Sequence, residues 1–495
     1  MSSRWGTLAV CLATGAGAVP AAAESVSAPA EAKAAPGRTR LAIVVGHNGS
    51  QTPGRAELRF ADDDAARYFE LLAPAMDRAW LLTGFDDLSQ EVFAELVPIA
   101  RTPTRIALEA VLLEAEVVLK AARERGDRTE LIFVYAGHGD VSDGMGFVNL
   151  EEGRLTRVDF EDLVLDGLPT DRKHVIIDAC RSYFLVSSRG PGGTRQVAPQ
   201  SYAGPRRRAG VGFVLSTSSD AESHEWASFQ GGVFSHEIRS ALSGGADLDL
   251  DGAVDYQELA AFVAVANEGI PQARYRPRFF IQPPSEDKAV PVFAPADTGV
   301  RWLELPERVE GRVRVTDHRG VPYADLNKAA GDVLRIALVG VGDHTVAWGD
   351  RRWRMDGALP RAELTSLPEA PGEVAARTQP HEAFRHLFST PMSAEVLRGW
   401  RLGARLTKSA PEPPPRRLRW LPPTMVGMGL ALAGGGAAML VAGAQSRSDL
   451  ADSSLSQADL ASRADEGDTL VAAGIVTAAT GLVLGTIGGL IWKRY

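Results

Sequence analysis

Two short motifs place an imidazole and a thiol directly after apolar runs that are typical of buried strands. YAGHGD carries His138 after the run 131–135, and DACRS carries Cys180 after the run 175–177. A cysteine and a histidine can cleave a peptide bond together, because the thiolate attacks the carbonyl while the imidazole holds and passes the proton. Gly139 has no Cβ, so its N–H, like that of Cys180, could reach and bind the developing oxyanion. On these residues alone, a buried pair without catalytic function is the alternative.

The cysteine content is consistent with a single reactive thiol. The chain has two cysteines, Cys11 and Cys180, and Cys11 lies in an N-terminal segment that reads as a secretory signal. A processed chain would keep one thiol, which excludes an intramolecular disulfide framework. Such a lone cysteine is either a candidate nucleophile or a buried, inert thiol.

The segment DLDLDGAVDYQE, residues 247–258, has the residue spacing of an EF-hand calcium loop. Carboxylates stand at the ligand positions, a glycine stands at the sharp turn, and a glutamate closes the loop. This spacing predicts Ca²⁺ as a possible cofactor, and no organic cofactor is expected. A charged loop that only shapes the fold is the alternative. The predicted ligands are Asp247, Asp249, Asp251, the carbonyl of Ala253, Asp255 and Glu258, with Gly252 at the turn.

Strand and helix patterns alternate along the first half of the chain. This alternation predicts an α/β domain over residues 38–285, with a mainly parallel sheet flanked by helices. In such sheets, ligands bind beyond the carboxyl ends of the strands. The expected strands are 41–45, 79–82, 131–135, 175–177 and 212–216, and the expected helices are 62–72, 105–123 and 159–164.

The flanking regions differ from this domain in composition. Residues 1–23 have an apolar stretch and a small-residue cleavage pattern, which predicts a signal peptide, and 24–37 is a low-complexity linker. Residues 298–365 contain short β-rich runs separated by turn residues, which predicts a small β-sandwich-like module. Residues 366–420 are expected to be partly helical and then Pro-rich.

Two uncharged apolar stretches, 424–444 and 469–492, are each long enough to cross a bilayer, and we predict two transmembrane helices. Arginines before the first stretch and basic residues after the second would place both flanks in the cytoplasm. A cleaved signal would instead place the main domain outside the cytoplasm. We favour the signal, so we expect a membrane protein of the cell envelope with the α/β domain on the exported side. The basic residues are Arg416, Arg417, Arg419, Lys493 and Arg494.

The charge pattern gives no indication of a nucleic-acid partner. The formal net charge is -9, and 23% of the residues are charged. The arginines are scattered along the chain, whereas nucleic-acid-binding proteins concentrate basic residues on one face. The sequence does not determine the oligomeric state.

Four segments in this order resemble the caspase and metacaspase family of cysteine peptidases, as in bacterial caspase-like proteins. They are FADDDAARYFELL, FVYAGHG, VIIDAC and VLSTSSDAESHE. The resemblance implies a caspase-like fold that acts on polypeptides, with Cys180 as nucleophile and His138 as general base and acid.

The resemblance also implies a substrate preference. In metacaspase-like members, acidic residues that match Asp178 and Asp64 by motif line the pocket for the side chain before the scissile bond. Carboxylates favour Arg or Lys there through charge-assisted hydrogen bonds. We therefore expect cleavage after Arg or Lys. For Asp64, an exposed charge in the first turn of a helix is the alternative.

A Gly-, Pro- and Arg-rich stretch, 184–210, follows the nucleophile motif. We expect a surface loop, and related enzymes often carry a cleavable linker at this place. Self-cleavage at one of its arginines is one hypothesis, and an uncut insertion is the other. The candidate sites are Arg189, Arg195, Arg206, Arg207 and Arg208.

Two functions other than proteolysis fit the same sequence. The first is a membrane-tethered interaction scaffold that keeps the fold without catalysis. The second is a Ca²⁺-responsive sensor in which occupancy of the loop 247–258 is the output. Because both His138 and Cys180 are present, the sequence favours the peptidase.

Overall fold

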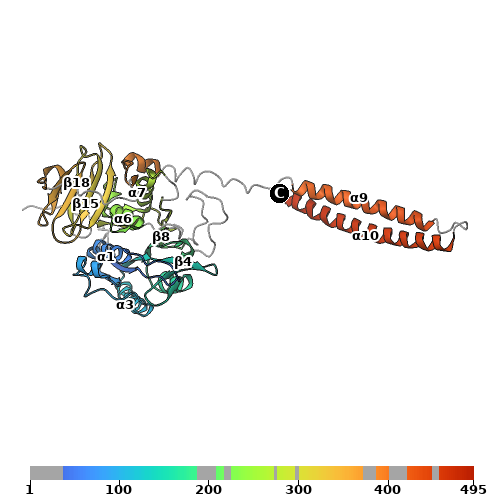
Figure 1. Cartoon of the computed structure of the whole chain (residues 1–495), viewed down its shortest axis with the longest axis horizontal. Coiled ribbons are helices and arrows are strands. Elements are labelled where there is room, and N and C mark those ends of the chain that lie inside the picture. Colours follow the sequence, from blue (N-terminus) through green and yellow to red (C-terminus); the bar gives the residue numbers. More distant parts are fainter. Residues whose placement is uncertain are drawn as a thin grey trace, which may run out of the picture. The chain divides into compact units, whose positions relative to one another are not determined.

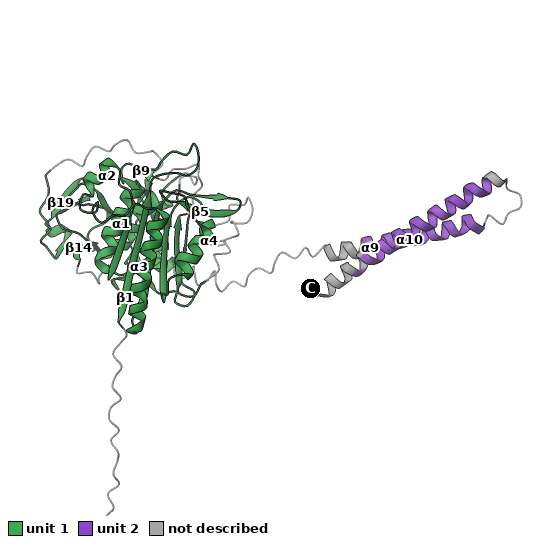
Figure 2. Ribbon diagram, turned by 90° about the horizontal axis from the view of Figure 1, so that it is seen from below, with its two compact units in different colours: residues 1–400 green, residues 401–495 purple. Residues whose placement is uncertain are grey.

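The computed structural model describes most of the chain, and the described residues form two compact units, one within 1–400 and one within 401–495 (Figure 2). The predicted signal peptide, most of both predicted linkers and residues 187–207 lie outside the described part. The described ranges are 37–186, 208–216, 225–271, 276–295, 300–371, 386–400, 421–448 and 456–494.

The first unit is built on a six-stranded sheet with the order β12-β8-β7-β3-β1-β2. Neighbouring strands run parallel from β8 to β2, whereas β12 runs antiparallel to β8. The sheet is therefore mixed, and the predicted α/β domain with a mainly parallel sheet is confirmed. The strands are β1 (Arg38–His47), β2 (Arg78–Leu82), β3 (Arg128–Gly137), β7 (Arg172–Asp178), β8 (Val211–Ser216) and β12 (Phe279–Gln282).

Helices cover both faces of this sheet, which explains why its strands are continuous apolar runs. Along β1, Ala42 and Val44 belong to one apolar core, and Ile43 and Val45 belong to the other. The first core includes α1 (Ala61–Leu72), α6 (Val233–Ser240) and α7 (Tyr256–Glu268) (Figure 1). The second includes α3 (Arg105–Glu124) and α4 (Arg157–Phe160), and α4 continues as a π-helical turn, Glu161–Asp166.

Short elements connect the strands near their carboxyl ends. After β3 the chain forms a small antiparallel sheet of β4 (Gly139–Ser142), β5 (Met145–Asn149) and β6 (Arg154–Thr156). After β7 it forms the short helix α5 (Tyr183–Val186), so the region predicted as a loop from 184 begins with helix. The remaining short elements of this domain are the 3-10 turn Ala73–Ala75, α2 (Asp87–Val92), β9 (Glu225–Trp226), β10 (Gly231–Gly232), the π-helical turn Ala241–Gly245, β11 (Val254–Asp255) and β13 (Pro291–Phe293).

The region predicted as a β-sandwich-like module forms two sheets, with the orders β17-β14-β20 and β16-β15-β18-β19, whose buried residues share one core (Figure 1). This β module contacts α6 and α1 of the same unit. The N–H of Asp325 donates to Ser240 Oγ at 3.0 Å, and Arg319 makes two 2.8 Å hydrogen bonds to Glu70. Its strands are β14 (Arg301–Leu305), β15 (Gly311–Thr316), β16 (Pro322–Lys328), β17 (Leu334–Leu338), β18 (His344–Trp348), β19 (Arg351–Met355) and β20 (Arg361–Glu363).

The second unit consists of two helices, α9 (Leu421–Ser448) and α10 (Gln457–Arg494), which lie side by side (Figure 2). Small residues allow their backbones to approach closely. A Cβ added to Gly436 would lie 2.5 Å from the backbone nitrogen of Ala478, and one added to Gly474 would lie 2.9 Å from the carbonyl oxygen of Gly436.

Within the described residues, one helical segment, Asp459–Val483, is long and apolar enough to cross a membrane by length and composition. A helix of a soluble protein can meet the same criterion. This segment overlaps the second predicted span, 469–492. The first predicted span, 424–444, is helical but does not meet the criterion, so the pair of transmembrane helices stays a prediction.

Candidate active site

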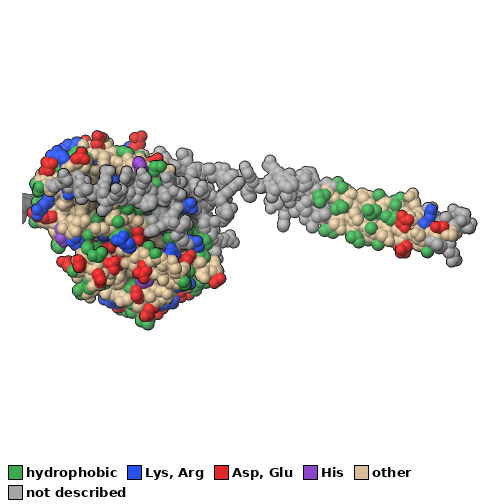
Figure 3. Space-filling view, in the orientation of Figure 1, with side chains coloured by type: hydrophobic (Ala, Val, Ile, Leu, Met, Phe, Trp, Pro, Cys, Tyr) green, Lys and Arg blue, Asp and Glu red, His purple; other side chains and the backbone are tan. Residues whose placement is uncertain are grey.

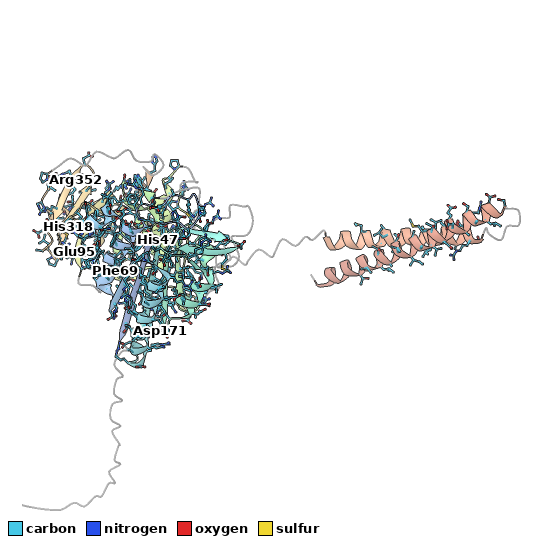
Figure 4. All side chains as sticks on the ribbon, turned by 60° about the horizontal axis from the view of Figure 1, so that its bottom comes forward. His47, Phe69, Glu95, Asp171, His318 and Arg352 are labelled. Atoms are coloured by element: carbon cyan, nitrogen blue, oxygen red, sulfur yellow. The ribbon has the colours of Figure 1, made fainter. Side chains whose placement is uncertain are left out.

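His138 and Cys180 follow the carboxyl ends of two neighbouring parallel strands, β3 and β7. In the parallel pair of β3 and β7, Ala136 lies opposite Asp178. His138 and Cys180 each follow this aligned pair by two residues. Both therefore emerge at the carboxyl-end edge of the sheet. His47, which ends β1 opposite Gly137, belongs to the same edge, and Figure 4 shows it far from Asp171, which precedes β7.

The backbone turns that carry these residues touch each other at Gly139. A Cβ added to Gly139 would lie 2.5 Å from the carbonyl oxygen of Cys180 and 3.0 Å from the Cβ of Ala179. Any side chain here would push the two turns apart. Glycine is therefore needed for the contact between the turns, in addition to the approach to a substrate carbonyl that the sequence suggested.

The surroundings of His138 hold its imidazole neutral. The ring is buried, and its Nε2 lies 3.0 Å from the carbonyl oxygen of Ala56. Burial, together with the positive charge of Arg55, lowers the pKa of His138 to about 4. Because a carbonyl only accepts, this contact assigns the proton to Nε2 and leaves Nδ1 as a proton acceptor. The Ala56 carbonyl thus orients the ring, and the sequence contained no signal for it.

The turn after the thiol is held in an uncommon conformation. Cys180 is partly exposed, and Arg181 directly after it has a φ of 53°, which non-glycine residues seldom adopt. Arg181 Nη1 lies 3.3 Å from Asp140 Oδ1, and Arg55 Nη1 donates to the Gly139 carbonyl at 3.2 Å. Asp140 therefore links the histidine turn to the cysteine turn. Sequence reasoning missed this link, although Asp140 and Arg181 both lie within the two motifs.

The two predicted specificity residues, Asp64 and Asp178, approach the same glycine. A Cβ added to Gly232 would lie 2.8 Å from Asp178 Oδ2 and 3.0 Å from Asp64 Oδ2. Asp178 accepts hydrogen bonds from the N–H and the hydroxyl of Ser235, at 3.0 and 2.6 Å. Asp64 accepts from the N–H of Gly232 at 2.7 Å and pairs with Arg239 at 2.6 Å. Residues far apart in the sequence thus form one acidic site.

A third carboxylate, Glu225, joins these two. In the β9–β10 ladder Glu225 lies opposite Gly232, and its side chain accepts the N–H groups of Arg59 and Phe60 at 3.0–3.1 Å. Burial raises the pKa of Glu225 to about 7, and the charges of Asp64 and Asp178 add to this shift. Sequence reasoning missed the role of Glu225, although this residue ends the segment VLSTSSDAESHE, because no fixed spacing relates it to the cysteine motif. We call Asp64, Asp178 and Glu225 the acidic cluster.

The members of the acidic cluster differ in what they can still bind. Asp64 is 3% exposed, and both its oxygens already have partners on β10 and α6. Asp178 is half-buried, and burial raises its pKa to about 6. Asp178 is therefore more exposed than Asp64, and Asp64 is mainly a structural charge within the cluster.

The loop 247–258 brings some of its predicted ligands together. One carboxylate oxygen each of Asp247, Asp249 and Glu258 lie within 4.8 Å of one another. Asp251 Oδ1 accepts the N–H of Ala253 at 2.9 Å, and Asp255 caps the start of α7. The first three thus form the candidate metal cluster, while Asp251 and Asp255 hold the backbone of the loop.

Comparison with known proteins identifies the domain that carries the dyad motifs. The family model described as the caspase domain matches residues 39–274. Residues 39–274 therefore belong to the caspase-like cysteine peptidase family. The solved structure titled pro-sf-caspase-1 is similar at 14% sequence identity and a TM-score of 0.30, with 50% of this chain and 87% of that chain covered. No curated protein matches this chain.

The family match covers the part of the chain that contains both motif turns. The caspase domain is characteristic of cysteine-type peptidases, which are hydrolases of polypeptides. It begins at β1 and ends shortly after α7, so it includes both turns, the acidic cluster and the loop 247–258. The β module and the two C-terminal helices lie outside the matched residues.

Proposed function

We propose that this chain is a caspase-like cysteine endopeptidase that uses Cys180 and His138 to cleave after Arg or Lys. The observation that carries the proposal is the alignment of the parallel strands β3 and β7. Ala136 lies opposite Asp178, and His138 and Cys180 each follow this pair by two residues. The absence of a side chain at Gly139 then allows the turn of His138 to lie directly against the carbonyl of Cys180.

In the proposed reaction, Nδ1 of His138 takes the thiol proton, and the sulfur of Cys180 attacks the substrate carbonyl carbon. The N–H groups of Gly139 and Cys180 donate to the oxyanion. Collapse of the intermediate breaks the C–N bond, and His138 returns the proton to the leaving amine. Water then attacks the thioester, which releases the acid and restores the thiol. A His138 pKa of about 4 suits this role, because the ring begins neutral and can accept a proton.

The acidic cluster supports the proposed preference for basic side chains. Asp178 is half-buried, and the carboxylates of Asp64 and Glu225 are close enough to interact with its charge. An incoming guanidinium or ammonium group would offset this accumulated charge and make charge-assisted hydrogen bonds. Arg239 already neutralises part of the charge through Asp64, so the remaining negative charge rests on Asp178 and Glu225.

The test is hydrolysis of fluorogenic peptides that end in Arg, Lys or Asp by the full chain purified in detergent. We expect cleavage of the Arg and Lys peptides, and a loss of at least about 1000-fold in Cys180→Ala and His138→Ala. The matched control is His318→Ala, because His318 is exposed in the β module, away from His47 at the sheet edge (Figure 4). Equal activity in Cys180→Ala would refute the dyad. Cleavage of Asp peptides alone would refute the specificity.

We also propose that the C-terminal helices anchor the peptidase in a membrane of the cell envelope, with the peptidase on the exported side. The apolar segment Asp459–Val483 supports the anchoring, and the signal-like residues 1–23 support export. Alkaline carbonate extraction of membranes should leave the full chain in the pellet and release a chain that ends at residue 400. Digestion of intact cells from outside should degrade the peptidase if it is exported.

Self-processing is a further proposal, and its candidate arginines in 187–207 lie outside the described residues. Arg208 is described, and it pairs with Asp166, so this residue is held against the π-helical turn 161–166. If the peptidase cuts its own linker, the wild-type chain should yield two fragments and Cys180→Ala should stay intact. Identical fragments from both chains would assign the cut to another protease.

A further inference from the structure

The loop 247–258 connects α6 to α7, two helices that contribute to the first apolar core. It begins after the π-helical turn 241–245 that continues α6, and it ends at the first turn of α7. In its second half, Val254 and Asp255 form β11, which pairs with β13. Whatever fixes this loop therefore fixes the junction between α6, α7 and β13.

The backbone of the loop is already folded around a central point. Gly252 has a φ of 84°, and its N–H donates to Asp247 Oδ2 at 3.1 Å. Asp255 Oδ1 accepts from the N–H groups of Gln257 and Glu258, at 2.7 and 2.8 Å. Asp247 and Glu258 are buried within this loop, whereas Asp249 is exposed at its surface.

Asp247 provides an independent indication that the loop binds a ligand. Its side chain is 4% exposed, and its Oδ1 has no hydrogen-bond partner among the described residues. A buried carboxylate oxygen without a partner is costly unless a proton or a cation compensates it. The same carboxylate belongs to the group with Asp249 and Glu258, whose ligand atoms lie within 4.8 Å of one another.

This spacing suits a hard cation with long bonds. Calcium binds oxygen ligands at about 2.3–2.6 Å, so ligand oxygens on its surface lie up to about 5 Å apart. Magnesium requires shorter bonds of about 2.1 Å and a stricter octahedron. Carboxylate oxygens favour either ion over softer transition metals.

We propose that the loop 247–258 is a Ca²⁺ site within the caspase domain, with Asp247, Asp249 and Glu258 as carboxylate ligands. The ion occupies the space between these oxygens and takes the free Oδ1 of Asp247. Binding fastens the end of α6 to the start of α7 and to β13. This proposal does not depend on peptidase activity.

The test is calorimetric titration of Ca²⁺ into the full chain in detergent, together with thermal unfolding in EDTA and in Ca²⁺. The variants are Asp247→Asn, which keeps an acceptor for Gly252, and Asp249→Asn at an exposed position where refolding problems are not expected. Glu268→Gln is the matched control, because it removes one exposed charge at the far end of α7.

We expect one Ca²⁺ per chain in the wild type and in Glu268→Gln, with a higher unfolding temperature in Ca²⁺. At a free concentration of about 100 times Kd, the folded-to-unfolded ratio should rise about 100-fold. Asp249→Asn should weaken binding at least tenfold, and Asp247→Asn should abolish it. No saturable binding up to about 10 mM would overturn the proposal, since loops of this kind bind at about 1 mM or tighter. Equal affinity in both Asn variants, or binding of Mg²⁺ alone, would also overturn it.

Discussion

Asp64 and Asp247 are both buried aspartates, but the groups that compensate their negative charges differ. Asp64 is 3% exposed, and the guanidinium of Arg239 and the N–H of Gly232 occupy its two oxygens. Asp247 is 4% exposed, and one oxygen accepts from Gly252 while the other has no partner among the described residues. Burial raises the pKa of Asp247 to about 6, with the charges of Asp251 and Asp249 adding to the shift. The protein thus compensates one carboxylate internally, and the other is suited to an external cation.

The difference shows that two groups of buried carboxylates in one protein can be suited to different ligands. Around Asp64 and Asp178, fixed cations and donors hold the negative charge in place, which suits repeated binding and release of a basic side chain. Around Asp247, the remaining negative charge is concentrated at one point, which suits a bound ion. Over the visible face of the described residues, acidic and basic side chains are interspersed (Figure 3). The buried partners, more than the surface charge, therefore distinguish the two sites.

The largest expected effect concerns the internal ion pair. Asp64→Asn leaves the guanidinium of Arg239 buried without its carboxylate, which should lower the free energy of unfolding by about 3–5 kcal/mol. Asp247→Asn in EDTA should change it by less than about 1 kcal/mol, because the asparagine oxygen can still accept from Gly252. Urea denaturation followed by tryptophan fluorescence measures both. Similar losses in the two variants would remove the distinction between these aspartates.

The next effect concerns Asp178 of the acidic cluster. Asp178→Asn removes the charge proposed to contact Arg or Lys of the substrate, and a hydrogen bond to a charged group contributes about 1.5–3 kcal/mol. The kcat/KM for Arg peptides should therefore fall about 10- to 100-fold. Asp87→Asn, at an exposed position on α2, is the control and should leave kcat/KM unchanged. Unaltered Arg cleavage in Asp178→Asn would place the substrate's side chain elsewhere.

The pH dependence of kcat/KM should show the ionisation of Asp178 and Glu225. The pKa of Asp178 is raised to about 6 and that of Glu225 to about 7, so both are protonated below these values and charged above them. The kcat/KM for Arg peptides should rise as pH increases through about 6 to 7, by tenfold or more. His138, with a pKa of about 4, is already neutral there and would place a rise near 4. A pH profile with its only rise near 4 would exclude the acidic cluster from substrate binding.

The smallest effect concerns an ion pair that is compensated internally but partly open to solvent. Arg319 contacts Glu70 across the boundary between the β module and α1, with side chains 23% and 29% exposed. Solvent screens such pairs, so Glu70→Gln, which leaves Arg319 paired with Asp317, should lower the free energy of unfolding by about 1 kcal/mol or less. Arg352→Met on β19 is the comparison, and Figure 4 shows Arg352 on the β module. If the free energy of unfolding fell as much as in Asp64→Asn, burial would not explain the difference between the Arg239–Asp64 and Arg319–Glu70 pairs.

Local patterns predicted much of the fold and part of the site. The apolar runs at 41–45 and 131–135 became the buried centres of β1 and β3, because strands covered on both faces must be apolar throughout. The motifs around His138 and Cys180 could be placed at one sheet edge, because parallel strands end on the same side. The antiparallel edge strand β12 (Phe279–Gln282) was not among the predicted strands, because its four residues are too short a run to stand out from the surrounding sequence.

The sequence by itself determined which chemical groups the protein contains and where each strand ends, since both depend on residues close together in the chain. Only the tertiary structure decided which groups meet. The Ala56 carbonyl beside His138, the Phe60 N–H on Glu225 and Arg239 on Asp64 each join residues more than 80 positions apart. No periodicity or spacing rule acts over such separations. These partners come together only when the helices pack on the sheet. A buried charge or donor then needs a hydrogen-bond or ionic partner from the segments that surround it in the fold.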